Sequence, residues 1–185
     1  MVKRIFSLAV KRGQFEKNPF DGISLMKIPQ KAVRLINENE FRRLMTAAQT
    51  PFWKARILIA KTSGLRRGEV LNLTVNDIDF AKSKIIVQPK PDSEHTWRWV
   101  VKDKERRELP LVEEVAKLLT AIQLELPEKQ PYFFLPPERY QYMMNLKAGG
   151  NLIDRIAKCP VANFRRGWKQ ICNKAVVKGI TFHDL

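Results

Sequence analysis

Apolar residues recur at helical spacing in both outer parts of the chain, so helices are predicted there. A basic amphipathic pattern predicts a helix over residues 2–14. Asn37 and Glu40 match a capping box, which predicts that a second helix begins at 37. The run 55–60 is apolar almost all round, as is typical of a buried helix. The remaining predicted helices cover residues 66–73, 112–122, 138–147 and 164–175.

The middle of the chain carries strand patterns between turn residues. The runs 77–80 and 84–87 flank a short turn and predict one hairpin. The runs 97–101 and 107–111 predict a second hairpin, with residues 102–105 at its tip. Residues 153–159 show no clear period. Helices around one small antiparallel sheet make the predicted fold an α+β domain that is mostly helical.

The charge balance points to a polyanionic partner. Lysine and arginine total 34 against 19 aspartates and glutamates, which gives a formal net charge of +15. Nucleic acid is the commonest partner for such an excess, although charge alone does not separate DNA from RNA or from an anionic membrane. No apolar run approaches the roughly 20 residues that a bilayer span needs. The first 15 residues lack the apolar region and cleavage site of a secretory signal.

The sequence offers few cysteine or histidine ligands for a metal. The two cysteines, Cys159 and Cys172, match no zinc spacing and are interpreted as free thiols in a reducing compartment. His95 and His183 are the only histidines. We therefore expect no metal, no other cofactor and a cytoplasmic protein.

A glycine turn leads into a short helix at residues 62–70, which read T-S-G-L-R-R-G-E-V. Arg66 stands at the start of this helix, where backbone N–H groups and the helix dipole favour a phosphate. Its guanidinium is a planar fork that can bond two phosphate oxygens together. Glu69 lies one turn farther along, where it could orient Arg66. The alternative is a surface ion pair worth roughly a few tenths of a kcal/mol.

Residues 181–185 read T-F-H-D-L, and with the glycine-turn segment they resemble the two active-site boxes of tyrosine recombinases, the phage integrase family. The resemblance implies that Arg66 clamps the scissile phosphate with Glu69 supporting it. It implies that His183 hydrogen-bonds that phosphate or takes the proton of the attacking tyrosine. Arg67, the neighbour of Arg66, becomes a candidate DNA contact. The implied fold is a set of helices around a three-stranded antiparallel sheet.

A lysine at the tip of the second predicted hairpin extends the resemblance. The family places a lysine there, ahead of a basic pair and an apolar-Pro-Leu ending, and the sequence from residue 102 reads K-D-K-E-R-R-E-L-P-L. The resemblance implies that Lys102 is the general acid that protonates the leaving 5′ oxygen, helped by cationic neighbours. Lys104 is the alternative, because hairpin register shifts by a residue or two. Either lysine could also be a solvated turn residue.

The resemblance divides the chain into three parts. Residues 1–27 resemble the end of the family's core-binding domain, 28–36 form a linker, and 37–185 resemble its catalytic domain, cut at the second box. We therefore expect the second active-site arginine and the nucleophilic tyrosine to be missing, and this chain to be inactive alone. The three tyrosines all precede His183 and are interpreted as packing or surface residues: Tyr132, Tyr140 and Tyr142.

Further residues are candidates for DNA contacts outside the two boxes. The last predicted helix carries three basic residues that could touch the DNA backbone: Arg165, Arg166 and Lys169. Such a face is also typical of an ordinary solvated helix. Trp97 and Trp99 alternate with Arg98, a mixture that can stack on nucleic acid. Tryptophans in this arrangement are more often packing residues.

The function implied by the resemblance is site-specific DNA recombination or integration, as in an integrase of a phage or mobile element. One DNA strand is cleaved and rejoined through a 3′-phosphotyrosyl intermediate, which stores the bond energy without ATP or a metal. The implied partners are duplex DNA and, in the full-length enzyme, further copies on that DNA. No membrane and no small-molecule substrate are expected. The alternatives are a non-catalytic DNA-binding regulator or degenerate relic of the same fold, and an RNA-binding basic domain.

Overall fold

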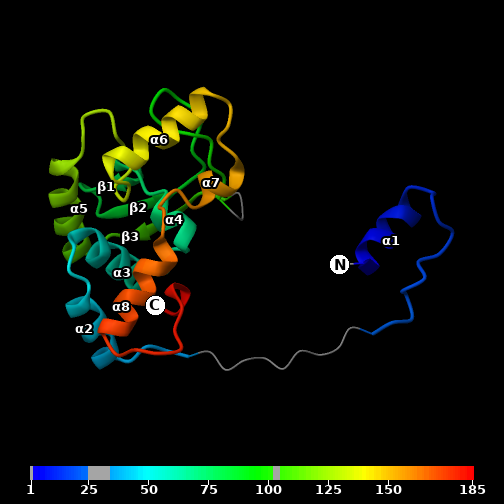
Figure 1. Cartoon of the computed structure of the whole chain (residues 1–185), viewed down its shortest axis with the longest axis horizontal. Helices are drawn as coiled ribbons and strands as arrows, with labels where there is room; N and C mark the ends of the chain where they lie inside the picture. The colour runs from blue at the N-terminus through cyan, green and yellow to red at the C-terminus, as the bar shows by residue number, and fades with distance from the viewer. Residues whose placement is uncertain (1, 25–33, 102–104) are drawn as a thin grey trace. The chain divides into compact units, whose positions relative to one another are not determined.

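A computed structural model of the chain describes residues 2–24, 34–101 and 105–185 (Figure 1). The chain divides into two compact units, residues 1–33 and 34–185, and each is described by itself. The N-terminal unit is built on helix α1 (Val2–Lys11). This helix ends three residues earlier than its amphipathic pattern predicts, because Gly13 adopts a positive φ of 69° that no continuing helix allows.

Aromatic packing closes the N-terminal unit on itself. The ring of Phe6 lies 5.3 Å from that of Phe15 and 5.2 Å from that of Phe20. The buried Asn18 donates from Nδ2 to the carbonyl oxygen of Lys3 at 2.9 Å. The turn that follows α1 therefore folds back on the apolar side of the helix.

The C-terminal unit places helices around a small sheet, as the sequence predicts. Its helices are α2 (Glu38–Ala47), α3 (Pro51–Ser63), α4 (Arg67–Leu71), α5 (Glu113–Glu125), α6 (Pro137–Ala148), α7 (Asp154–Lys158) and α8 (Phe164–Lys174). Its strands are β1 (Ile78–Asp79), β2 (Lys84–Val87) and β3 (Arg107–Pro110), and its 3₁₀ turns are η1 (Val75–Asp77) and η2 (Phe182–Asp184). In Figure 1 α8 runs beside α2, which it contacts, and α5 lies against α3. The capping box at Asn37 and Glu40 is present.

The sheet is antiparallel and has the order β1-β2-β3. The predicted hairpin between 97–101 and 107–111 is wrong, because the described residues 97–101 contribute no strand to this sheet. Strand β3 pairs with β2 instead, with Arg107 opposite Val87. The backbone N–H of Trp97 donates to the hydroxyl of Tyr132 at 3.3 Å, so it is not available to a neighbouring strand.

Helix α3 lies at the centre of the core and packs against α4, α5 and η2. Its run 55–60 is buried throughout, as its apolar pattern predicts. Arg56 is buried within that run, where Nη2 donates to the carbonyl oxygen of Phe134 at 2.8 Å. Its guanidinium also lies 5.0 Å from the Trp53 ring. Burial lowers the pKa of Arg56 to about 10.

Candidate active site

The first box forms a turn around a buried carboxylate. Gly64 ends α3 in the left-handed region, with φ of 62°, and Arg66 then occupies the N-cap position of α4. Oε2 of Glu69 accepts from the backbone N–H of Arg66 at 2.8 Å, and Oε1 lies 3.5 Å from Nη1 of Arg66. Nη2 of Arg107, at the start of β3, lies 2.5 Å from Oε2. The carboxylate is 4% exposed, whereas the Arg66 and Arg107 side chains are 42% and 33% exposed.

Arg66 and His183, far apart in the sequence, line one cleft of about 680 Å³. The rest of its lining comes from α4, from the end of α7 and from residues 99–101: Arg67, Gly68, Glu69, Trp99, Val100, Val101 and Lys158. The cleft therefore presents three arginine or lysine side chains and one imidazole around a buried acid. This arrangement suits an oxyanion such as a phosphate diester.

The second box is a capped turn. Oδ2 of Asp184 accepts from the backbone N–H of Thr181 at 2.5 Å and from its hydroxyl at 2.9 Å. Phe182, the next residue in the sequence, is buried, while His183 is exposed and lines the cleft. Thr181, Phe182 and Asp184 thus fix the turn, which leaves the side chain of His183 at the cleft.

An aromatic cluster ties the second box to α3 and α8. The Phe182 ring lies 5.0 Å from that of Phe164 and 5.4 Å from that of Trp168, both edge-to-face. The Phe164 ring lies 5.1 Å from that of Trp53. Gly167 makes this approach possible, because a Cβ atom there would stand 2.6 Å from Cζ2 of Trp53. The position of His183 therefore depends on packing by residues outside its own box.

A buried ion pair holds residues 97–101, the segment that reaches the cleft. Nζ of Lys90 lies 2.9 Å from Oδ2 of Asp77 and 4.8 Å from the ring of Trp99, and all three residues are buried. Lys90 and Trp99 also exchange two backbone hydrogen bonds, at 2.9 and 3.1 Å. Trp97 stacks on Tyr132 with the centroids 4.0 Å apart. The packing interpretation of Trp97 and Trp99 is therefore confirmed, and both are too buried to stack on nucleic acid.

Lys158 is a cleft residue that sequence reasoning missed. It ends α7, a helix of five residues that is too short to show a period. Its backbone oxygen accepts from Nδ2 of Asn72 at 3.4 Å, which joins α7 to α4, and its Nζ lies 3.3 Å from Oδ2 of Asp154. The i,i+4 spacing of Asp154 and Lys158 is the signal that could have indicated this helix.

The sequence profile of the phage integrase family matches residues 34–185, which is most of the chain and the whole C-terminal unit. The chain belongs to the phage integrase family. The chain is similar to the protein of Caldanaerobacter subterraneus subsp. tengcongensis named Tyrosine recombinase XerC-like. The two sequences are 26% identical over an alignment of 203 residues, gaps included, which covers 100% of this chain and 51% of the relative. The chain thus spans about half the length of that relative.

Solved structures of a recombinase and of two integrases share the fold. The crystal structure of XerA recombinase aligns with a TM-score of 0.57 at 20% identity, over 98% of this chain and 56% of that one. The Tn1549 transposon integrase, solved in complex with a circular intermediate DNA, aligns with a TM-score of 0.59 at 20% identity, over 98% of this chain and 60% of its own. The integrase from mycobacterium phage Brujita aligns with a TM-score of 0.53 at 20% identity.

Lys102, the predicted general acid, and its alternative Lys104 both lie outside the described residues. The described residues on either side of them reach the cleft. Val101 lines the cleft directly, and Arg107 is bound to Glu69. The assignment of Lys102 as general acid, with Lys104 as its alternative, stays a prediction.

The three tyrosines lie away from the cleft lining. Tyr132 is fully buried, and burial raises the pKa of its hydroxyl. The Tyr140 hydroxyl donates toward two carbonyl oxygens, those of His95 and Lys129, each at 3.0 Å. Tyr142 is exposed, with the Arg139 guanidinium 4.7 Å from its ring. Their interpretation as packing or surface residues is confirmed, and the described lining of the cleft contains no tyrosine.

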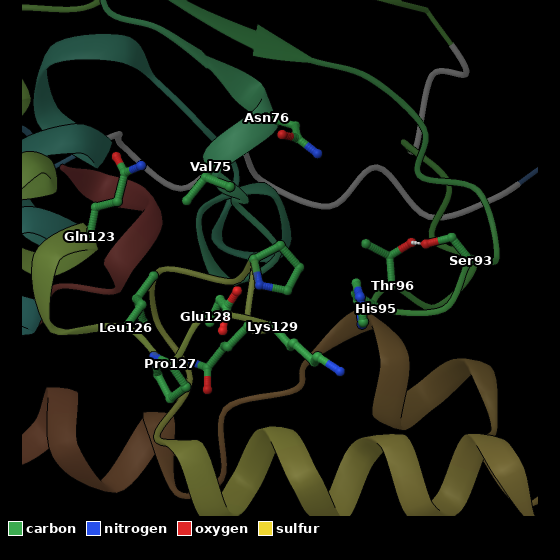
Figure 2. Close-up of a pocket in the computed structure, with 12 residues that line it drawn as sticks. Val75, Asn76, Ser93, His95, Thr96, Gln123, Leu126, Pro127, Glu128 and Lys129 are labelled. Carbon is green, nitrogen blue, oxygen red and sulfur yellow. Dashed lines mark hydrogen bonds between the residues drawn. The ribbon is translucent and has the colours of Figure 1, made fainter.

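A separate hollow of about 350 Å³ lies between η1, the loop before Trp97 and the connection from α5 to α6 (Figure 2). Its lining includes His95 and Lys129 but no residue predicted for the active site. Within the described parts of the chain, no cluster of three or more metal-ligating side chains occurs. None of the helices described there is long and apolar enough to cross a membrane.

Proposed function

We propose that this chain acts in site-specific DNA recombination or integration, with its C-terminal unit supplying the phosphate-binding side of a tyrosine recombinase active site. The observation that carries the proposal is the meeting of Arg66 and His183 in one basic cleft, in the two boxes that the family resemblance assigns to catalysis. Residues 1–27 are proposed to belong to the family's core-binding domain, residues 28–36 to a linker, and residues 37–185 to the catalytic domain.

The proposed chemistry is a transfer of a phosphoryl group between two oxygens. A tyrosine hydroxyl attacks the scissile phosphorus, a 3′-phosphotyrosyl bond forms, and the bond to the 5′ oxygen breaks. Arg66 holds the non-bridging oxygens and offsets their charge, with its guanidinium held by the buried Glu69. His183 hydrogen-bonds the same phosphate or takes the tyrosine proton. Lys102, or Lys104, gives a proton to the leaving 5′ oxygen, and the reverse sequence rejoins the strand.

The partner in this proposal is duplex DNA, with further copies of the protein assembled on it, in a bacterial or phage-infected cytoplasm. Arg67 lines the cleft and Arg165 lines a groove next to it, so both support a DNA contact. Arg166 and Lys169 are exposed on α8 and stay predictions of the helix pattern. A DNA-binding protein without strand transfer is the second candidate, favoured by the absence of a tyrosine from the described cleft lining.

Equilibrium binding to a fluorescent duplex tests the proposal. We expect affinity to fall steeply with salt, by about 0.9 in the log–log slope for each phosphate contacted. The Arg66→Ala variant should bind more weakly and with a shallower slope. Arg43→Ala is the matched control, because Arg43 is exposed on α2 and is not part of the cleft lining. Salt-insensitive binding of the unaltered chain, or an equal effect of both variants, would contradict the proposal.

A further inference from the structure

Residues 91–101, which we call the strap, supply the apolar side chains of the described cleft lining. Trp99, Val100 and Val101 line the cleft together with Arg66 and His183. Apolar groups beside a charged site keep water away from it, and electrostatic attraction is stronger where water is excluded. The position of the strap therefore affects how strongly the cleft attracts a phosphate.

Two cavities separate the strap from α7. One, of about 290 Å³, lies between Trp97, Arg98 and the helix, and the other, of about 250 Å³, lies between Arg98, Val100 and the helix. Asp154 and Ala157 of α7 line both cavities. The strap therefore has room to move on this side, and its position depends on contacts elsewhere.

Lys147, in the last turn of α6, holds the strap at three points. Its Nζ donates to the carbonyl oxygens of Ser93 and Thr96, to the second at 2.8 Å, and lies 2.5 Å from Oδ1 of Asp92. An ammonium group has three N–H donors, so each of them has an acceptor here. Oγ of Ser93 and Oγ1 of Thr96 lie 2.6 Å apart, which closes the strap into a turn (Figure 2). The Lys147 side chain is only 22% exposed, which limits screening by solvent.

Tyr140, two helical turns before Lys147 on α6, extends this hold toward the cleft. Its hydroxyl lies 3.0 Å from the carbonyl oxygen of His95 in the strap. Its ring lies 6.1 Å from that of Tyr132, which stacks on Trp97 with the centroids 4.0 Å apart. A packed path thus joins α6 to a strap residue that is two positions before the cleft wall. Close-packed groups of this kind transmit a displacement to their neighbours.

We propose that Lys147 is a positioning residue for the active-site cleft: it fastens the strap to α6, so that residues 99–101 keep their place beside Arg66. Without this ammonium group the strap relaxes toward the two cavities, and the cleft binds a phosphate less tightly. Lys147 does not line the cleft, so it acts through the strap and not by touching the ligand. This inference rests on the proposed function and adds to it a residue that shapes the site.

A change of one lysine, with a matched control, tests the proposal. Lys147→Met keeps the apolar stem and removes the ammonium group, so we expect about three- to tenfold weaker binding to a fluorescent duplex at low salt. Lys117→Met removes the same charge from an exposed lysine of α5 that also pairs with a carboxylate and does not line the cleft. It should have a much smaller effect. Equal losses in the two variants would overturn the inference and show that net charge alone matters.

A double-mutant cycle with Arg66→Ala separates positioning from a general effect on stability. If Lys147 acts through the cleft, Lys147→Met should weaken binding much less once the Arg66 guanidinium is gone. Additive losses would contradict the inference. Urea denaturation checks that each protein is folded under the binding conditions. If Lys147→Met does not fold, Tyr140→Phe takes its place in the cycle, because it removes only one hydroxyl of the same hold; unchanged affinity in that variant would count against the inference.

The unaltered chain distinguishes this inference from the proposed function. Its failure to bind duplex DNA would reject the proposed function itself. Duplex binding that Lys147→Met leaves intact would reject only the positioning role of Lys147.

Discussion

Nη2 of Arg107 lies 2.5 Å from Oε2 of Glu69, the same oxygen that accepts the backbone N–H of Arg66. One buried carboxylate thus joins the first residue of β3 to the turn that carries the first box. The contact sets the distance between Arg66, which we propose binds the phosphate, and the strand that follows Lys102 and Lys104. The geometry of the cleft therefore depends on Glu69, although this carboxylate need not touch DNA itself.

The first prediction concerns this carboxylate. Glu69→Gln removes the buried carboxylate charge that both guanidiniums contact, so we expect the free energy of unfolding to fall by about 1–3 kcal/mol. DNA binding should weaken as well, because Arg66 loses its support. Urea denaturation and duplex binding measure the two effects. Glu113→Gln is the control, since its pair with Lys117 is exposed, and it should change neither value by a measurable amount.

The second prediction concerns Gly167. Helix propensity alone says that Gly167→Ala should stabilise α8 by roughly 1 kcal/mol. The added methyl group would stand 2.6 Å from the Trp53 ring, so we expect a net destabilisation of about 1–3 kcal/mol instead. Thermal unfolding decides the sign. Adding Trp53→Phe, which removes the atom in conflict, should restore part of the loss, and a stabilised single variant would contradict the described packing.

The third prediction concerns the buried pair of Lys90 and Asp77. Lys90→Met leaves the Asp77 carboxylate buried without its cation, which should cost about 3–5 kcal/mol of unfolding free energy. The double variant Lys90→Met with Asp77→Asn should recover a large part of this cost, because no unpaired charge remains. Urea denaturation of the four proteins in this cycle measures the coupling. Additive losses would show that the two side chains do not interact.

The fourth prediction concerns covalent chemistry. We expect the chain of residues 1–185 to form no covalent adduct with a nicked suicide DNA substrate, because its tyrosines lie outside the cleft lining and two of them are buried. Denaturing electrophoresis detects an adduct as a shifted band. A band that disappeared in Tyr132→Phe, Tyr140→Phe or Tyr142→Phe would show that one of these residues reaches a phosphate.

Sequence patterns predicted the features that depend on neighbouring residues. The capping box of Asn37, the buried run of α3 and the turn at Gly64 each follow from residues within one or two turns. The resemblance to the two boxes indicated that Arg66 and His183 share a site, although no local pattern specifies their approach. The fold class followed from the same helix and strand patterns.

Contacts between distant segments escaped sequence reasoning. Arg107 was noted only as one of a basic pair, because its bond to Glu69 joins residues far apart in the chain. Lys158 was missed because a five-residue helix is too short for periodicity to identify. The alternation of Trp97 and Trp99 predicted a strand, but their burial comes from Tyr132 and Lys90 and not from pairing within the sheet.

The two histidines of the chain allow a direct test of the central claim, that the cleft of Arg66 and His183 holds a DNA phosphate. His183 lines this cleft, while His95 lines the separate hollow of Figure 2, so each ring reports on one site. The measurement is a proton–carbon correlation spectrum of the histidine rings during titration with duplex DNA at low salt, with His95→Gln assigning the signals. We expect the His183 signal to shift with the binding isotherm, the His95 signal to stay in place, and Arg66→Ala to diminish the shift. A shift of His95 alone, or DNA binding that leaves His183 unchanged, would contradict it.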